Sequence, residues 1–126
     1  MNNINLEPNK DTPRVLLDND NGLIEFEGNS YPGDAYEFYT PLLAWLKEYF
    51  DGNAQESTTV NIKLGYFNSA TSQILYDMLD LLKDAMSNSL IVNWHYNSEN
   101  EDSFEDYEDM AEEFPELNLN PIPYTT

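Results

Sequence analysis

The stretch STTVNIKLGYFNSATSQILYDMLDLLKDAMSNSLIVNWHY, residues 57–96, decides the fold class because its hydrophobic period changes twice. Residues 57–67 alternate apolar and polar side chains, which predicts a β-strand. Residues 69–89 repeat apolar side chains at spacings of three and four, which predicts a helix. Residues 90–96 are mostly apolar and predict a second, central strand. This order implies a right-handed crossover between two parallel strands.

A β-hairpin is predicted on the N-terminal side of this unit. In RVLLDNDNGLIEFEG, residues 14–28, two apolar runs flank the pair Asn21 and Gly22. This pair can supply the positive φ angles that a tight turn needs. The predicted strands are residues 14–17 and 23–27.

The segment between the hairpin and residue 57 predicts another helix. Residues 38–50 carry apolar and aromatic side chains at helical spacing. Pro41 suits the first position of a helix, which makes Thr40 its expected N-cap, with a short helical turn before it. Gly52 is expected to end the helix.

The acid-rich stretch ENEDSFEDYEDMAEEFPE, residues 99–116, predicts a third helix. Ten of its 18 residues are acidic, yet its apolar residues recur at spacings of three and four. We therefore expect a surface helix with an acidic face and an apolar stripe rather than a disordered tail. The stripe consists of Phe104, Tyr107, Met110, Ala111 and Phe114.

Together these segments predict a single α/β domain over residues 1–126, with element order β-β-α-β-α-β-α. We expect a small mixed sheet of four to five strands with the helices packed on it. Residues 1–13 are expected to be loose. Residues 117–126 are expected to form an irregular tail that could add a short edge segment, although its two prolines limit pairing.

The composition excludes several classes of partner. The chain has 126 residues and a formal net charge of −19, from 24 acidic and five basic side chains. Such a charge repels nucleic acid and anionic membranes, so neither is expected as a partner. No apolar run reaches the roughly 20 residues that span a bilayer. Residues 1–13 lack the basic start and apolar core of a signal peptide, so the expected location is cytoplasmic.

Metal, cofactor and catalytic signatures are also missing from the sequence. There is no cysteine and a single histidine, His95, for which a structural role is expected because no nucleophile or carboxylate is placed beside it. The acidic loop after residue 17 does not match a calcium loop. Counted from Asp18, position six is Leu23 instead of Gly, and position twelve is Asn29 instead of Glu. We expect no metal, no cofactor and no enzymatic activity.

The junction between residues 57–67 and the following helix carries four small polar side chains: Asn68, Ser69, Thr71 and Ser72. One interpretation is that Ser69 is an N-cap, worth about 1 kcal/mol over Ala. The other is a phosphorylation site, because the N-terminus of a helix favours a phosphate. The residues alone favour the cap and leave the phosphate site open.

Three blocks of the sequence resemble the SiaC family of small bacterial regulatory phosphoproteins, which are STAS-like and akin to anti-sigma-factor antagonists. They are NSYPGDAYEFYTPLLAWLKEYF, LGYFNSATSQILYDMLDLL and VNWHY, and the similarity covers about residues 12–114. The family usually has Ser-Tyr-Pro-Glu-Asn where this chain has residues 30–34, Ser-Tyr-Pro-Gly-Asp. It usually has Asn-Thr-Ser-Ser where this chain has residues 68–71, Asn-Ser-Ala-Thr. The phosphoacceptor Thr of the family falls on Ser69.

The resemblance implies a non-catalytic partner switch. A Ser/Thr protein kinase would phosphorylate the protein and a PP2C-type phosphatase would restore it. The unphosphorylated form would bind a target, which in the namesake system is a diguanylate cyclase that the binding activates. Ser69 would carry the phosphate, with Thr71 and Ser72 as alternates. The recognition surface around it is expected to include Tyr31, Tyr66, Phe67 and Asn68.

An alternative function follows from the charge. An acidic interaction protein could act as a decoy that mimics nucleic acid and binds basic partners. Such binding would weaken steeply with salt and would not depend on Ser69.

Overall fold

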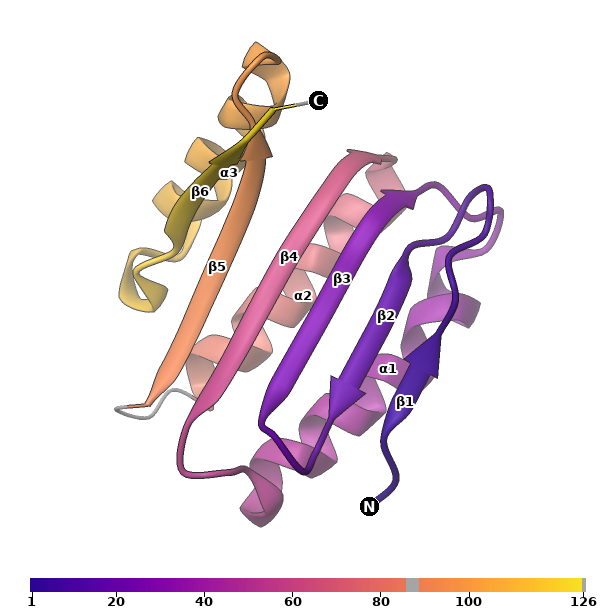
Figure 1. Cartoon of the computed structure of the whole chain (residues 1–126), viewed down its shortest axis with the longest axis vertical. Helices are drawn as coiled ribbons and strands as arrows, with labels where there is room; N and C mark the ends of the chain where they lie inside the picture. Colours follow the sequence, from indigo (N-terminus) through magenta and orange to yellow (C-terminus); the bar gives the residue numbers. More distant parts are fainter. Residues whose placement is uncertain (86–88, 126) are drawn as a thin grey trace.

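The computed structural model describes residues 1–85 and 89–125, which form one six-stranded sheet and three α-helices (Figure 1). The strands are β1 (Ile4–Leu6), β2 (Arg14–Asp18), β3 (Leu23–Ser30), β4 (Thr58–Phe67), β5 (Leu90–Asn97) and β6 (Asn120–Tyr124). The helices are α1 (Ala35–Glu48), α2 (Ser69–Asp84) and α3 (Glu101–Glu113). A π-helical turn (Tyr49–Asn53) follows α1, and a 3₁₀ turn (Pro115–Leu117) follows α3.

The strands lie in chain order across the sheet, from β1 to β6. β1, β2 and β3 pair antiparallel, whereas β3, β4, β5 and β6 pair parallel. The mixed sheet, the hairpin and the parallel pairing on either side of α2 are therefore confirmed. The predicted count of four to five strands is wrong, because one strand is added at the N-terminal edge and one at the C-terminal edge. The STAS-like arrangement stays a prediction.

The N-terminal edge strand lies in the segment that we expected to be loose. β1 pairs with β2 in the register Ile4↔Leu17 and Leu6↔Val15. The indole Nε1 of Trp45 in α1 donates a hydrogen bond of 2.7 Å to the carbonyl oxygen of Asn2. Three residues are too few to show an alternating pattern, so only the tertiary pairing reveals this strand.

The C-terminal edge strand lies in the predicted irregular tail. β6 pairs parallel with β5, in the register Asn93↔Asn120 to Asn97↔Tyr124. In a parallel strand the N–H and C=O of one residue face the same neighbour, and the carbonyl of Tyr124 accepts from the amide of Ser98 at 2.9 Å. Pro121 and Pro123 therefore face the open edge, where no donor is needed. The prolines permit the strand and also block further pairing at that edge.

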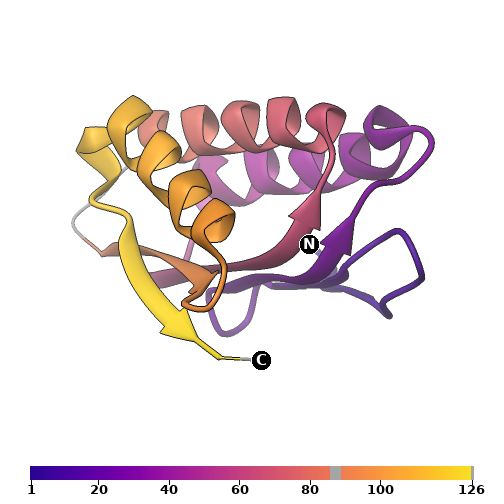
Figure 2. The same cartoon turned by 90° about the horizontal axis from the view of Figure 1, so that it is seen from above.

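All three helices lie on one face of the sheet, as Figure 2 shows. Sequential parallel crossovers that advance in one direction place their helices on the same side. The core therefore forms a single layer between sheet and helices. Its fully buried side chains come from both layers and include Leu17, Phe26, Val60, Ile62, Leu42, Leu46, Ile74, Leu75, Met78 and Leu79.

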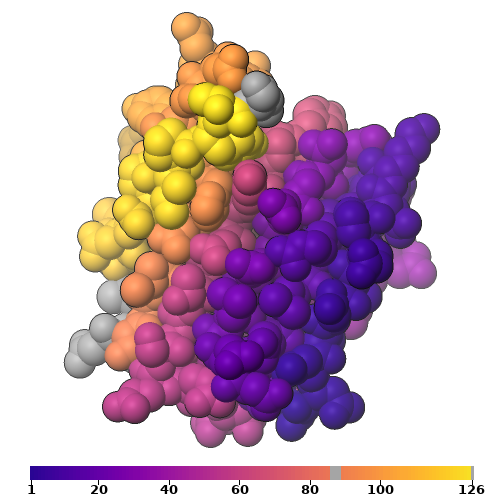
Figure 3. All heavy atoms as spheres, viewed as in Figure 1, coloured from indigo at the N-terminus to yellow at the C-terminus, as the bar shows by residue number. Residues whose placement is uncertain are grey.

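The opposite face of the sheet carries a chain of polar side chains and is seen in Figure 3. Glu25 accepts from Nη2 of Arg14 and from Nδ2 of Asn61, each at 2.9 Å. The amide chain continues from Asn93 to Asn61 at 2.8 Å and from Asn120 to Asn93 at 3.0 Å. One polar residue from each of the five neighbouring strands β2 to β6 thus takes part in a hydrogen-bonded chain that links these strands across the open face of the sheet.

The start of α1 differs from the prediction. The helix begins at Ala35, and its N-cap is Asp34, whose Oδ1 accepts from the amide of Glu37 at 3.0 Å. Pro41 lies inside the helix, and the Thr40 hydroxyl donates to the carbonyl of Tyr36 at 2.6 Å instead of capping. The cap at Asp34 outweighed the preference of proline for a first position.

The ends of the helices agree better with the sequence. Gly52 takes a positive φ of 91° and closes the π-helical turn after α1. The predicted helix over residues 69–89 is confirmed to Asp84, and residues 86–88 of that prediction lie outside the described residues. The acidic helix is confirmed as α3, with Met110 and Phe114 of its stripe buried.

In the hairpin, Gly22 alone of the expected pair has a positive φ.

Candidate functional site

The candidate site lies where β4 ends at Phe67 and α2 begins at Ser69. The N-cap is Asn68, whose side-chain Oδ1 accepts from the amide of Thr71 at 2.9 Å. Its carbonyl accepts from the amide of Ser72, also at 2.9 Å. The predicted cap at Ser69 is therefore wrong by one residue. Ser69 is the first helical residue, and its hydroxyl is not the capping group.

The three hydroxyl groups of the junction differ in accessibility. Ser69 is exposed, Ser72 is half-buried, and Thr71 has 0% of its surface exposed. A modifying enzyme must reach the hydroxyl oxygen, so the geometry favours Ser69 over Thr71. Sequence spacing did not separate these candidates, because all of them lie within one turn of helix.

Thr71 is buried because it joins a cluster of hydroxyl groups from three elements. Its Oγ1 lies 2.9 Å from Oγ of Ser30, the last residue of β3, and 3.2 Å from the carbonyl oxygen of Ser30. Ser30 Oγ also lies 2.6 Å from the phenol oxygen of Tyr39 in α1. All three residues are fully buried. Burial raises the pKa of Tyr39 to about 12, so its phenol stays protonated at neutral pH.

The predicted recognition residues meet at the same end of the sheet. β3 and β4 are parallel neighbours and pair at Ser30↔Phe67, which brings Tyr31 next to Tyr66. Their rings contact edge to face, with centroids 5.7 Å apart. Tyr66 is 60% exposed, whereas Tyr31, Phe67 and Asn68 are half-buried. The structure therefore brings all four residues to the end of the sheet at which α2 and Ser69 begin.

Sequence reasoning missed one exposed aromatic side chain in the helix that follows Tyr31. Tyr36 is 57% exposed in the first turn of α1, directly after the loop that carries Tyr31. With the helix expected to start at Pro41, Tyr36 could not be placed on an exposed helical face. An Asp followed three residues later by Glu, as at Asp34 and Glu37, was the signal for the earlier start.

His95 lies on the open face of the sheet, away from the junction. It lines a hollow of about 180 Å³ together with Arg14, Glu25, Phe26, Glu27, Asn61 and Lys63. Burial and then the charge of Lys63 lower the pKa of His95. The lining contains no hydroxyl or thiol nucleophile, so no nucleophilic triad forms there. Among the described residues, no group of three His, Asp or Glu side chains could hold a metal ion.

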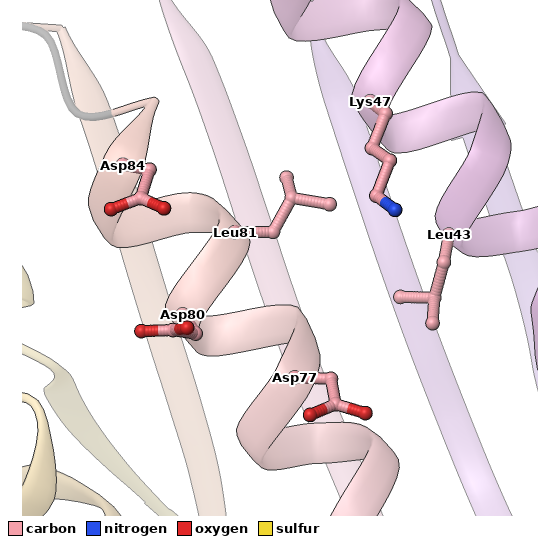
Figure 4. Close-up of a pocket in the computed structure, with 6 residues that line it drawn as sticks. All are labelled: Leu43, Lys47, Asp77, Asp80, Leu81 and Asp84. Carbon is pink, nitrogen blue, oxygen red and sulfur yellow. The ribbon is translucent and has the colours of Figure 1, made fainter.

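A larger groove, of about 480 Å³, lies between α1 and α2 (Figure 4). Leu43 and Lys47 of α1 line one side. The opposite side, from the last turns of α2, consists of Asp77, Asp80, Leu81 and Asp84. None of the predicted site residues lies in this groove. No described helix is both long enough and apolar enough to cross a membrane.

This arrangement defines a class of protein. Across its described residues the chain is a small α/β domain with one mixed six-stranded sheet and three helices. The chain belongs to the SiaC family of regulatory phosphoproteins, which it matches over residues 6–124. The family expected from the three sequence blocks is therefore confirmed. The family description also confirms that the chain is regulatory and not an enzyme.

Known proteins resemble the chain over nearly its whole length. An uncharacterized protein of Pseudomonas aeruginosa, strain UCBPP-PA14, is 30% identical over 118 residues, which are 92% of this chain and 90% of the relative. The structure of SiaC of Pseudomonas aeruginosa superposes with a TM-score of 0.80 at 23% identity and covers 100% of both chains.

A third comparison concerns a complex. The structure of the diguanylate cyclase SiaD with its activator SiaC, from Pseudomonas aeruginosa, matches with a TM-score of 0.79 at 25% identity. The match covers 98% of this chain and 99% of the matched chain. In that complex SiaC is the activator of a diguanylate cyclase.

Proposed function

We propose that this chain is a phospho-regulated partner-switch protein whose unphosphorylated form binds and activates a diguanylate cyclase. Phosphorylation of Ser69 blocks that binding. The observation that carries the proposal is the position of Ser69, which is exposed on the first turn of α2, at the end of the sheet where the rings of Tyr31 and Tyr66 make contact. The family description and the activator role of SiaC support the same function.

The switch needs two reactions at Ser69. A Ser/Thr protein kinase transfers the γ-phosphoryl group of ATP to the serine Oγ. A new O–P bond forms as the bond to the β-phosphate oxygen breaks, ADP leaves, and a base of the kinase takes the hydroxyl proton. A PP2C-type phosphatase hydrolyses the phosphoserine with water and returns the hydroxyl and inorganic phosphate.

A phosphate on Ser69 is compatible with the fold of α2. The N-terminus of α2 carries a partial positive charge, and its first turn contains no acidic residue. A phosphate at this end of a helix is stabilised by the helix dipole and by backbone amides. The modification therefore changes the surface without unfolding the helix.

The same phosphate opposes binding of the target. It adds about 1.5 to 2 negative charges to a surface built from tyrosine rings. A partner that covers Tyr31 and Tyr66 must then remove water from a dianion, in a protein whose net charge is already −19. Repulsion and desolvation together release the partner. We place this exchange in the bacterial cytoplasm, where the substrate of a diguanylate cyclase is made.

A second candidate function rests on the charge density of α3. Eight of its 13 residues are acidic, and burial together with repulsion from Asp109, Asp102 and Glu105 raises the pKa of Asp106 to about 6. An acidic decoy would use this helix to bind basic proteins. Its binding would fall steeply with salt and would be indifferent to Ser69.

The experiment compares binding of purified wild-type protein, Ser69→Ala and Ser69→Glu to purified SiaD of Pseudomonas aeruginosa, with cyclase activity as a second readout. We expect wild type and Ser69→Ala to bind and activate, and Ser69→Glu to bind at least tenfold more weakly. Ser72→Glu is the matched control, because it adds the same charge one turn further along α2. Equal binding by all four proteins would overturn the proposal, and loss of binding in 0.5 M salt irrespective of Ser69 would favour the decoy.

The modification itself is tested on protein purified from the cells that make it. Mass spectrometry with and without phosphatase treatment is expected to place one phosphate on Ser69. A phosphate confined to sites outside residues 68–72 would contradict the assignment.

A further inference from the structure

In the buried hydroxyl cluster of Ser30, Tyr39 and Thr71, counting the hydroxyl protons assigns the donor and the acceptor of each hydrogen bond. Thr71 Oγ1 donates to the carbonyl of Ser30, which uses its only hydroxyl proton. The 2.9 Å contact between the two side chains must then be a donation from Ser30 Oγ to Thr71 Oγ1. The proton of Ser30 is thereby used as well, so Tyr39 donates to Ser30 Oγ at 2.6 Å.

This chain of donors fastens three elements to one another. The carbonyl of Ser30 also accepts from the amide of Asn68 at 3.0 Å. The last residue of β3 therefore holds the N-cap and the first turn of α2, while Tyr39 ties α1 to the same point. The closed set of bonds, which we call the latch, consists of Ser30, Tyr39 and Thr71.

We propose that the latch selects the phosphorylated residue, because it withdraws the hydroxyl of Thr71 and displays that of Ser69. This inference deepens the proposed function and rests on it. Ser69 and Thr71 are two positions apart, so a kinase that reads the local sequence encounters both. The latch engages the only proton of Thr71 and buries its lone pairs, whereas Ser69 stays in solvent.

Transfer of a phosphoryl group to Thr71 requires the latch to open first. Opening breaks the two contacts that Thr71 Oγ1 makes with Ser30 and leaves buried polar groups without partners. Each such hydrogen bond raises the ratio of closed to open molecules by a factor of roughly five to ten. We therefore expect Thr71 to receive phosphate roughly 25- to 100-fold less often than Ser69, although a kinase accepts both residue types.

The fold supplies a matched control at the other end of the sheet. The phenol of Tyr49 lies 2.8 Å from Oγ1 of Thr58 and accepts from the amide of Gln55 at 3.1 Å. Tyr39 and Tyr49 are both fully buried and both bond a hydroxyl on a strand. Tyr49→Phe therefore removes the same chemical group as Tyr39→Phe without touching the latch.

The test uses the Ser69→Ala background, in which the preferred acceptor is missing. The full-length protein is purified from the cells that make it, and the phosphate on Thr71 is quantified by mass spectrometry. We expect almost none in Ser69→Ala alone. Adding Tyr39→Phe is expected to raise it roughly fivefold and adding Ser30→Ala roughly tenfold or more, whereas adding Tyr49→Phe leaves it unchanged.

Amide hydrogen exchange provides a readout that needs no kinase. Exchange of the amides of residues 69–72 is expected to accelerate in Tyr39→Phe and Ser30→Ala but not in Tyr49→Phe. The latch alone would be overturned if all variants showed equal exchange rates and equal amounts of phosphate on Thr71. It would also be overturned if the exchange rate and the Thr71 phosphate rose as much in the Tyr49→Phe control as in Tyr39→Phe. Wild-type protein with phosphate on Thr71 would also overturn it. A wild-type protein with no phosphate in residues 68–72 would overturn the proposed function together with the latch.

Discussion

Tyr31 and Tyr66 meet edge to face at the carboxyl end of two parallel strands, with ring centroids 5.7 Å apart and planes inclined at 64°. Tyr31 follows the last residue of β3, and Tyr66 is the penultimate residue of β4. The contact leaves Tyr66 60% exposed, although a tyrosine ring is a large apolar surface. Exposed aromatic rings of this kind supply much of the binding energy at protein interfaces.

Tyr66→Ala is expected to weaken binding to SiaD by at least tenfold, because it removes the most exposed ring beside Ser69. Stability should change by less than about 1 kcal/mol, since the side chain lies largely in solvent. Titration of the purified proteins and urea unfolding measure the two effects. Ile91→Ala is the control, because Ile91 is 50% exposed near the opposite end of the sheet. Binding that falls equally in both variants would contradict a surface at the junction.

Asn68→Ala is expected to lower the free energy of unfolding by about 1 kcal/mol, because the amide of Thr71 loses its cap. Ser69→Ala is expected to change it by less than about 0.5 kcal/mol, since Ser69 is exposed and is not the cap. Urea unfolding of both variants checks the assignment. A larger loss in Ser69→Ala than in Asn68→Ala would show that the serine caps the helix.

Asp106→Asn is expected to stabilise the protein at pH 7. Burial and the neighbouring acidic groups of α3 raise the pKa of Asp106 to about 6, above its ordinary value of 3.8. The folded state therefore binds this proton more tightly than the unfolded state, and this group's contribution to stability falls as pH rises from about 4 to above 6. Because solvent screens a half-exposed group, we expect a gain in Tm of only about 2 °C.

The pH dependence provides the check on Asp106. Thermal unfolding at pH 7.5 should show the full gain in Asp106→Asn, and at pH 4.5 the gain should be clearly smaller because the carboxyl group is then protonated in the folded state. Glu112→Gln, an exposed change on the same helix, should show a smaller effect. A gain in Asp106→Asn that is the same at both pH values would contradict the raised pKa.

Asn61→Ala is expected to lower the free energy of unfolding by about 1 kcal/mol without weakening binding to SiaD. Asn61 links Glu25 to Asn93 in the polar chain across the open face of the sheet. The variant thus breaks that chain in its middle but leaves the end of the sheet near Ser69 intact. Loss of SiaD binding in a variant that remains folded would move the docking surface to the open face.

The elements with many periodic residues were predictable from the sequence. The pattern in residues 57–96 gave β4, α2 and β5, and the apolar stripe gave α3 in spite of its acidity. The edge strand β1 was not predictable, because it is short and forms only by pairing with a strand that is already in place. Of β6, the possibility of a short edge segment was predictable, and the structure confirms it. The start of α1 was misplaced because a proline signal competed with the cap at Asp34.

The candidate site was predictable as a stretch but not as a set of atoms. Helical spacing places Ser69, Thr71 and Ser72 within one turn, and no local pattern says which of them faces the core. Thr71 is withdrawn by Ser30 and Tyr39, which lie 41 and 32 positions earlier in the chain. Such contacts depend on how β3, α1 and α2 pack, so they cannot be predicted from the local sequence around residue 71.

By itself the sequence determined the parallel strand–helix–strand unit, the acidity of α3 and the group of small polar side chains at residues 68–72, because these follow from side-chain period and composition. The tertiary structure alone decided the six-stranded count, the cap at Asn68 and the separation of Ser69 from Thr71. The physical reason is that hydroxyl groups compete for buried partners contributed by distant strands and helices. Only the packed fold determines which hydroxyl finds a partner and which remains in water.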